Sequence, residues 1–260
     1  MKNWDVSINY GIKTGFNDAF IIDSAKREQI LTNCKTDEER ERTAAIIRPI
    51  LRGRDIKRYG YSWDEKYIIA TFPSMQYNIE DYQAIKSYLL GFGMERLEQT
   101  GKEYVINGEK VRARKKTNNK WFETQDSISY WDDFDKTKIV WIELSDESKF
   151  AICDNYIPLN TVFFLTGSHL SHILGLLNSK LINWYFRNCI GTSSGAGTNR
   201  WLKYTVELLP ILPYDLEIET LVNLRLTSDS DHVSLELQID KIVCKKYGLT
   251  EEEAEFILEN

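Results

Sequence analysis

The chain has 260 residues, of which 42% are hydrophobic and 28% are charged, and its formal net charge is -6. This length and apolar content suffice for a buried core in one large domain or two small ones. No apolar stretch approaches the roughly 18 residues of a membrane span, and the N-terminus lacks a signal-peptide core, so we expect a cytoplasmic protein without a membrane partner.

The first half of the chain alternates short strands and helices. Thr36 and Glu39 form a capping box, in which a hydroxyl and a carboxylate satisfy free amide groups at a helix start. In chain order, we expect a strand, a turn and a strand over residues 8–22, helical structure over 25–46, a strand over 66–72 and a helix over about 79–99.

A hairpin is predicted around residues 104–111. Asn107 and Gly108 separate two apolar runs, and both residue types tolerate the positive φ of a two-residue turn. The basic segment 110–122 therefore leaves the sheet on a hairpin arm.

The second half begins with three core strands between residues 138 and 165, which are rich in β-branched and aromatic residues. The apolar period then becomes helical from Leu170 to about Cys189, after Ser168 as cap. We therefore predict an α+β fold: a mixed β-sheet body with flanking helices, residues 1–215, and a C-terminal helical appendage, residues 216–260.

Positive charge is concentrated in two places despite the acidic average. Residues 215–260 hold 12 acidic and 4 basic residues, which leaves a small positive excess in the remainder. Residues 48–60 contain five cations and a single acid, Asp55, and residues 110–122 contain six cations and no acid. One such run can be a solvated face, but two together favour a polyanionic partner.

The segment 191–201, GTSSGAGTNRW, matches the glycine–serine–glycine pattern of a nucleophile elbow at Ser193. An elbow needs a strand before the serine and a helix after it, whereas a helix is expected first here. Asp231 and His232 could complete a catalytic triad only through an unusual loop, because they are adjacent. A serine hydrolase therefore stays an alternative.

Other catalytic or metal-binding patterns are weak. A small metal-dependent nuclease could use Glu147 and Lys149, with Asp132 and Asp133 upstream. His169 and His172 lie one helical turn apart but have no recognisable third ligand, so we expect exposed histidines. The four cysteines, which have no paired spacing, are expected to be buried thiols: Cys34, Cys153, Cys189 and Cys244. No two prolines adjoin, so the double-proline motif of adenine methyltransferases is not present.

Two segments combine residue types that suit DNA. Cations position a protein on phosphates, amides read base edges, and aromatic rings stack or wedge. For Trp121 and Trp201, burial in the core is an equal alternative. The candidate DNA-binding residues are Arg112, Arg114, Lys115, Lys116, Asn118, Asn119, Lys120 and Trp121 in one segment, and Ser193, Ser194, Thr198, Asn199, Arg200 and Lys203 in the other.

Six stretches together resemble a known family. They are GIKTGFNDAFII, IIRPILRGRDIKRY, KYII, LLNSKLINWYF, TNRWLKYTVELLPI and IDKIVCKKYGLTEEE. In this order they resemble the target-recognition region of Type IIG restriction-modification enzymes, the TaqI-like C-terminal specificity domain, and more distantly the specificity subunits of Type I systems. The resemblance covers nearly the entire chain.

The resemblance implies a module that reads double-stranded DNA, with an adenine methyltransferase domain, and often a nuclease, upstream in the same polypeptide. It implies S-adenosylmethionine, and Mg for a nuclease, in those upstream domains, and no cofactor or catalysis in this chain. Within the matching stretches, Lys13, Thr14, Asn17, Arg52, Arg54, Lys57 and Arg58 would contact DNA or hold loops, with Asp55 as an ion-pair partner. Base readout is expected in or near residues 73–137. A protein-interaction role for the acidic tail is a further alternative.

Overall fold

The computed structural model describes residues 1, 4–191, 193, 194, 198–228 and 231–259. The chain forms two compact units. The first comprises Met1–Gly11, Arg52–Ser62 and Asp135–Asn260, and the second comprises Ile12–Leu51 and Trp63–Phe134. The predicted boundary at residue 215 is not a boundary between these units. Both units combine helices and strands, so the α+β class is confirmed.

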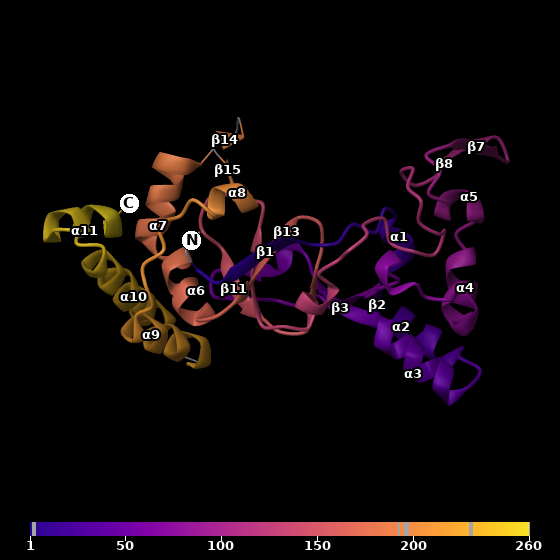
Figure 1. The fold of residues 1–260 in the computed structure, drawn as a ribbon, viewed down its shortest axis with the longest axis horizontal. Coiled ribbons are helices and arrows are strands. Elements are labelled where there is room, and N and C mark those ends of the chain that lie inside the picture. The colour runs from indigo at the N-terminus through magenta and orange to yellow at the C-terminus, as the bar shows by residue number, and fades with distance from the viewer. Residues whose placement is uncertain (2–3, 192, 195–197, 229–230, 260) are drawn as a thin grey trace. The chain divides into compact units, whose positions relative to one another are not determined.

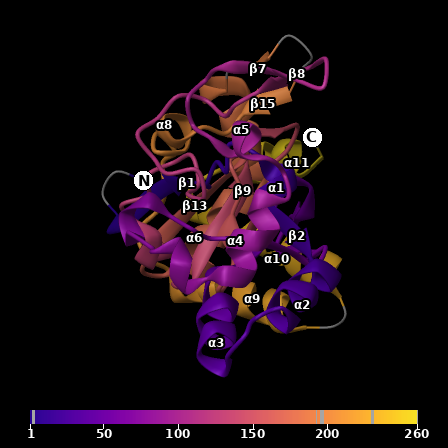
Figure 2. The ribbon, with the colours of Figure 1, turned by 90° about the vertical axis from the view of Figure 1, so that its right-hand side faces the viewer.

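The first unit is built on the antiparallel sheet β1-β13-β9-β11 (Figures 1 and 2). Its elements are β1(Val6–Tyr10), the 3-10 turn η1(Gly53–Asp55), β4(Ile56–Lys57), β5(Gly60–Tyr61), β9(Lys138–Ile142), β10(Leu144–Ser145), β11(Phe150–Cys153), β12(Ile157–Pro158), β13(Val162–Gly167), α6(Leu170–Asn178), α7(Lys180–Tyr185), the π-helical turn η5(Phe186–Ile190), β14(Ser193–Ser194), β15(Thr198–Arg200), α8(Lys203–Val206), α9(Leu216–Thr227), α10(His232–Lys246) and α11(Glu251–Glu259).

The pairing of the strands aligns apolar side chains on the face of this sheet that packs against the helices. Leu165 of β13 pairs with Ile8 of β1 and with Ile139 of β9. These three side chains are buried in one core with residues of α6. Because side chains alternate across a strand, a single register fixes which residues enter the core. The three strands predicted between residues 138 and 165 are thus confirmed.

Helices α9, α10 and α11 are part of the core of the first unit. Ile218, Val222, Ile239, Val243 and Ile257 are all buried there, and α9 packs against α6 (Figure 1). The helical character predicted for residues 216–260 is confirmed. These helices complete the core of the sheet, which an appendage would not do.

The second unit contains the antiparallel strands β2, β6 and β3, a hairpin and several helices. Its elements are α1(Asn17–Phe20), β2(Ile21–Asp23), α2(Ser24–Thr32), α3(Asp37–Ile46), β3(Ile47–Leu51), β6(Lys66–Ile69), η2(Pro73–Met75), η3(Ile79–Asp81), α4(Gln83–Leu90), α5(Met94–Leu97), β7(Glu103–Ile106), β8(Glu109–Arg112) and η4(Trp131–Phe134), where η marks 3-10 turns.

The predicted capping box starts α3. Thr36 Oγ1 accepts the Glu39 amide at 3.1 Å, and the Glu39 carboxylate accepts the amides of Lys35 and Ala84, both at 2.9 Å. Glu39 therefore caps α3 and also ties α4 to it. The predicted hairpin is confirmed as well, with φ of 52° at Asn107 and 85° at Gly108.

Three predicted elements differ in detail. A short helix, α1, occupies residues 17–20, where the second strand predicted within 8–22 was expected, and the strand β2 begins only at Ile21. The helix predicted over 79–99 is divided into η3, α4 and α5: α4 ends at Leu90, and Gly93, with a φ of 86°, immediately precedes α5. The helix predicted from residue 170 is interrupted at Ser179, whose side chain caps α7 by accepting the Ile182 amide at 3.2 Å.

Two expectations about single side chains are wrong. Cys189 is exposed and Cys34 is half-buried, whereas Cys153 and Cys244 are buried as expected, and all four thiols are free.

No helix in the described part of the chain has the length and hydropathy that a membrane span requires.

Candidate nucleic-acid interface

Arg114 is the centre of the loop that follows the hairpin in the second unit. Its Nε donates to Leu97 O at 2.8 Å, and its Nη1 donates to Thr14 O at 3.0 Å and to Glu123 O at 2.7 Å. Its Nη2 donates to Trp121 O at 2.5 Å. Burial lowers the pKa of this guanidinium to about 10, so it stays charged at neutral pH. With an exposed fraction of 4%, Arg114 joins its own loop to Leu97 and Thr14, which is a structural role, and the DNA contact predicted for it stays a prediction.

Further internal bonds fix the same loop. Gln99 Nε2 donates to the carbonyls of Lys120 and Glu123 at 3.1 and 3.0 Å. Asn119 Nδ2 donates to Thr124 O at 3.1 Å, so this amide stabilises the loop itself, and its predicted role in base reading stays a prediction. The loop 113–125 is therefore held in one shape before any partner binds.

This arrangement leaves a row of polar side chains exposed. Within the described ranges, no hydrogen bond or ion pair engages the side chains of Arg112, Lys115, Lys116 or Asn118, and all four are exposed. Lys120 is also exposed and lies 3.9 Å from a Glu123 oxygen. We call these five residues the loop surface. Preorganised cations beside a free amide are the groups that phosphate and base contacts require.

Trp121 is half-buried against the core of the second unit, with its ring edge-to-face on Phe122. This position favours the packing alternative for Trp121 over stacking on a base.

The GIKTGFN stretch is partly structural. Thr14 is buried, and its hydroxyl donates to Asn17 Oδ1 at 2.7 Å while accepting the Phe16 amide at 3.1 Å. Thr14 thus stabilises the start of α1, which agrees with the loop-holding role considered for this stretch. Lys13 has an exposed side chain, and its backbone amide donates to Asp126 at 3.1 Å. Lys13 and Asn17 therefore stay predictions as DNA contacts.

In the first unit, the RGRD segment is stabilised by hydrogen bonds between its own residues. Arg52 donates to both oxygens of Asp55, from Nε at 3.2 Å and from Nη2 at 3.0 Å, and its backbone amide donates at 2.8 Å. Asp55 is buried, which agrees with the ion-pair role considered for it. Arg54 and Lys57 are exposed. The segment thus keeps two candidate contacts and uses Arg52 for its own fold.

Arg58 also has an internal role. Its guanidinium lies 2.9 Å from Glu236 and 3.6 Å from Asp240, both on α10, and it covers the ring of Tyr59. Arg225 binds the same Glu236 at 2.7 Å. Arg58 thereby ties the RGRDIKR segment to the C-terminal helices.

In the segment 191–203, the polar side chains of residues 199, 200 and 203, which the structure describes, are buried or engaged by other groups. Asn199 is buried, Arg200 binds Glu143 at 2.7 Å, and Lys203 Nζ donates to Ile8 O at 2.8 Å. The side chains of Ser193, Ser194 and Thr198 lie outside the described part of the chain, so their predicted roles stay predictions. The backbone of Ser193 and Ser194 pairs with β15 after a π-helical turn. This is not the strand-to-helix turn of a nucleophile elbow.

Trp201 belongs to the core of the first unit. Its ring stacks on Phe186 with centroids 3.6 Å apart and an interplanar angle of 6°, and it is 1% exposed. Its Nε1 donates to Ser145 O at 3.3 Å, and its carbonyl accepts Trp141 Nε1 at 2.8 Å. Trp201 thus holds β10 and β9 from inside, which settles the choice between core and stacking.

We expect Trp201→Ala to lower the free energy of unfolding by about 3–5 kcal/mol, because it removes a buried aromatic ring and leaves a cavity. Urea unfolding followed by circular dichroism measures this loss. A loss below about 1 kcal/mol would contradict the core role.

Where the structure describes their side chains, the groups considered for catalysis have other partners or lie apart. Among the described residues, no three or more His, Cys, Asp and Glu side chains lie where they could hold a metal ion. His172 is buried against Trp4, not exposed as expected, and its burial lowers its pKa. Lys149 forms an ion pair with Glu147 at 3.3 Å. His232 contacts Ser228 O at 2.7 Å, four residues earlier in the chain.

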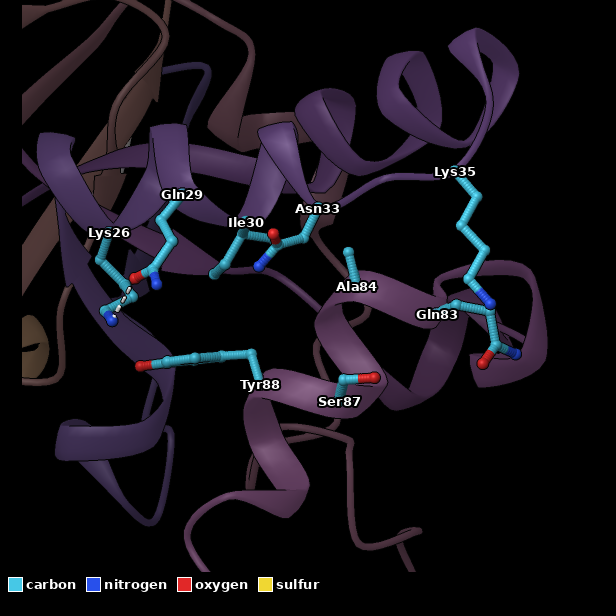
Figure 3. A pocket seen from close by; sticks show the side chains of 9 residues that line it. All are labelled: Lys26, Gln29, Ile30, Asn33, Lys35, Gln83, Ala84, Ser87 and Tyr88. Atoms are coloured by element: carbon cyan, nitrogen blue, oxygen red, sulfur yellow. Dashed lines mark hydrogen bonds between the residues drawn. The ribbon is translucent and has the colours of Figure 1, made fainter.

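The second unit also contains a polar cleft that the sequence did not predict. It lies between α2 and α4 with a volume of about 430 Å³, and Figure 3 shows side chains from both helices around it. Lys26 donates to Gln29 at 2.6 Å, and burial raises the pKa of Tyr88 to about 12. Lysines and amides line the cleft without a carboxylate. Its residues come from α2, the segment after α2, and α4, so no local sequence pattern could reveal it.

Comparison with known proteins places these features in a family. The sequence model of the TaqI-like C-terminal specificity domain matches residues 48–211. A comparison with curated protein sequences gives no match. Among solved structures, the Type IIL restriction-modification enzyme MmeI in complex with DNA is similar with a TM-score of 0.59 and 15% identity over 98% of this chain.

The Type IIG restriction endonuclease BpuSI is similar with a TM-score of 0.48 and 11% identity over 94% of this chain. The chain spans 36% of the MmeI chain and 31% of the BpuSI chain. The family match covers more than half of the sequence and agrees with the resemblance of the six stretches. The chain therefore belongs to the family of TaqI-like C-terminal specificity domains.

Proposed function

We propose that the chain recognises a specific sequence in double-stranded DNA and directs a restriction-modification enzyme to it. The observation that carries this proposal is the loop surface, where three cations and one amide are exposed and unpaired on a loop fixed by Arg114. Family membership supports the same function. The structural relative MmeI is described in complex with DNA, which adds support for a DNA partner.

The loop surface divides into phosphate and base contacts. Lys115 and Lys116 are point charges that suit backbone phosphates, which give affinity without sequence information. The Arg112 fork matches the major-groove edge of guanine, and the Asn118 amide matches that of adenine. In this proposal, specificity depends mainly on Arg112 and Asn118.

The proposal places chemistry outside this chain. Methylation of adenine, and cleavage where it occurs, would be carried out by methyltransferase and nuclease domains upstream in the same polypeptide, with S-adenosylmethionine and Mg bound there. The chain itself would be non-catalytic and work in the cytoplasm on cellular or invading DNA.

Selection from a random duplex library tests the proposal. We expect the chain to enrich a single sequence motif, because base-edge contacts each discriminate by about 1–3 kcal/mol. Asn118→Ala should relax the selected motif at one position and leave the remaining positions unchanged. Recovery of the input distribution, with no enriched motif at low salt, would refute sequence-specific recognition.

A further inference from the structure

A second polar cavity lies in the first unit. The loop surface belongs to the second unit, so the two share no residue. Its volume is about 200 Å³, and the residues that line it include Arg58, Glu147, Ser148, Lys180, Asn183 and Arg187. Ligand pockets for drug-sized molecules usually have volumes of about 300–1,000 Å³, so this cavity suits a smaller group.

The walls of the cavity are fixed by side-chain bonds to the backbone. Asn183 Oδ1 accepts the Ser148 amide at 3.0 Å, and Asn178 makes two bonds to the backbone of Phe150, at 3.1 and 2.9 Å. Because its oxygen is already engaged, Asn183 has its NH₂ group left as a donor. The lining is thus held in place without a ligand.

Hydrogen-bond donors exceed acceptors in this lining. Over the described residues, the Ser148 hydroxyl, Asn183 Nδ2 and the Arg187 guanidinium have no partner. Arg58 also lines the cavity. Its Nε is buried without a hydrogen-bond acceptor, and its Nη2, which also makes no hydrogen bond, lies 3.6 Å from Asp240 in an ion pair. Buried donors without an acceptor are rare in proteins. A site with this many unused donors favours a ligand that supplies several acceptors.

The charges of the lining point in the same direction. Arg58, Lys180 and Arg187 are cations, and Glu147 is the acid that opposes them. Lys149 lies 3.3 Å from Glu147 and partly offsets its charge. Arg58 retains its ion pair with Glu236, so Arg187, which is exposed, is the cation most available to a ligand.

We propose that this cavity binds one phosphate group through Arg187, Asn183 and Ser148, with Arg58 and Lys180 supplying further positive charge. A phosphate offers acceptor oxygens on every side and up to two negative charges, which matches the donors and the charge of the lining. The group could belong to the DNA backbone or to free phosphate or a phosphorylated small molecule. The proposal holds whether or not the chain reads a DNA sequence.

Titration of the full chain with inorganic phosphate, followed by NMR of the Asn183 side-chain amide and the Arg187 Nε, tests this site. We expect saturable shifts of both resonances. Arg187→Gln should weaken phosphate binding about tenfold, because it removes a charge-assisted hydrogen bond. Lys241→Gln, which removes an exposed cation of α10 outside the cavity, should leave the affinity unchanged.

A short duplex distinguishes the two sources of phosphate. Shifts of the same resonances with duplex DNA identify a backbone phosphate as the ligand. Saturable shifts with inorganic phosphate alone identify a free phosphate or a phosphorylated small molecule. Shifts that do not saturate, or that are equal in Arg187→Gln and the intact chain, would overturn the site. A chain that binds phosphate here but selects no DNA motif would contradict the recognition function alone.

Discussion

Replacement of Arg114 by alanine is expected to lower the free energy of unfolding of the second unit by about 3 kcal/mol or more. The change leaves the carbonyls of Leu97, Thr14 and Trp121 without their buried donor, and each unsatisfied buried group costs about 1–3 kcal/mol. Arg114→Lys should restore only part of this stability, because an ammonium cannot reproduce the planar fork of a guanidinium. Chemical unfolding measures both losses.

Arg112 is the matched control, two residues earlier on the same chain segment. It is exposed and has no partner among the described residues, so Arg112→Ala should change stability by no more than about 0.5 kcal/mol. The two variants should therefore differ in both measurements. Arg114→Ala should have a lower free energy of unfolding, whereas Arg112→Ala should keep its stability and bind duplex DNA more weakly. Equal stability of the two variants would contradict the anchoring role of Arg114.

Neutralising Lys115 and Lys116 together, by replacement with glutamine, is expected to weaken duplex binding about tenfold or more at low salt. Both ammonium groups are exposed and unpaired in the described structure, so their charge is available to phosphates and their removal should not disturb the fold. Fluorescence anisotropy of a labelled duplex measures the dissociation constant, and thermal unfolding verifies that the variant is folded.

Lys66 and Lys86 provide a control with the same change of net charge in the same unit. Lys66 lies 3.9 Å from Asp23 and Lys86 lies 2.6 Å from Glu80, so a neighbouring acid already offsets each charge. Glutamine at these two positions should reduce affinity about threefold at most, as screened surface charges contribute little. An equal loss for both pairs would show that net charge alone, and not the loop surface, governs binding.

The sequence predicted those parts of the fold that depend on local chemistry. The capping box at Thr36, the turn at Asn107 and Gly108 and the strands after residue 138 follow from patterns within a few residues. The division into units could not be predicted, because the first unit assembles three separate segments. Likewise, the apolar period from Leu170 predicts a helix, but it does not show that α9 packs against this helix.

Residue type alone predicted the candidate site, and the structure divides its residues into exposed side chains and side chains bonded within the fold. Arg112 and Arg114 are both arginines of the same basic segment, so the sequence does not distinguish them. Only the tertiary structure shows that carbonyl groups surround Arg114. Asn118 and Asn119 differ in the same way, because Asn118 is exposed and Asn119 bonds to the backbone of its own loop. The cleft at Lys26 and the phosphate cavity were not predicted, since their residues meet only in the folded chain.

The dependence of duplex affinity on salt tests the central claim most directly. If four to six phosphates are neutralised, the logarithm of the association constant should fall against the logarithm of salt concentration with a slope of about -3.6 to -5.4. Replacing Lys115 and Lys116 by glutamine should reduce the magnitude of this slope by about 1.8, from about 0.9 per phosphate contact. A slope near zero, or one unchanged by the double replacement, would contradict DNA binding through the loop surface.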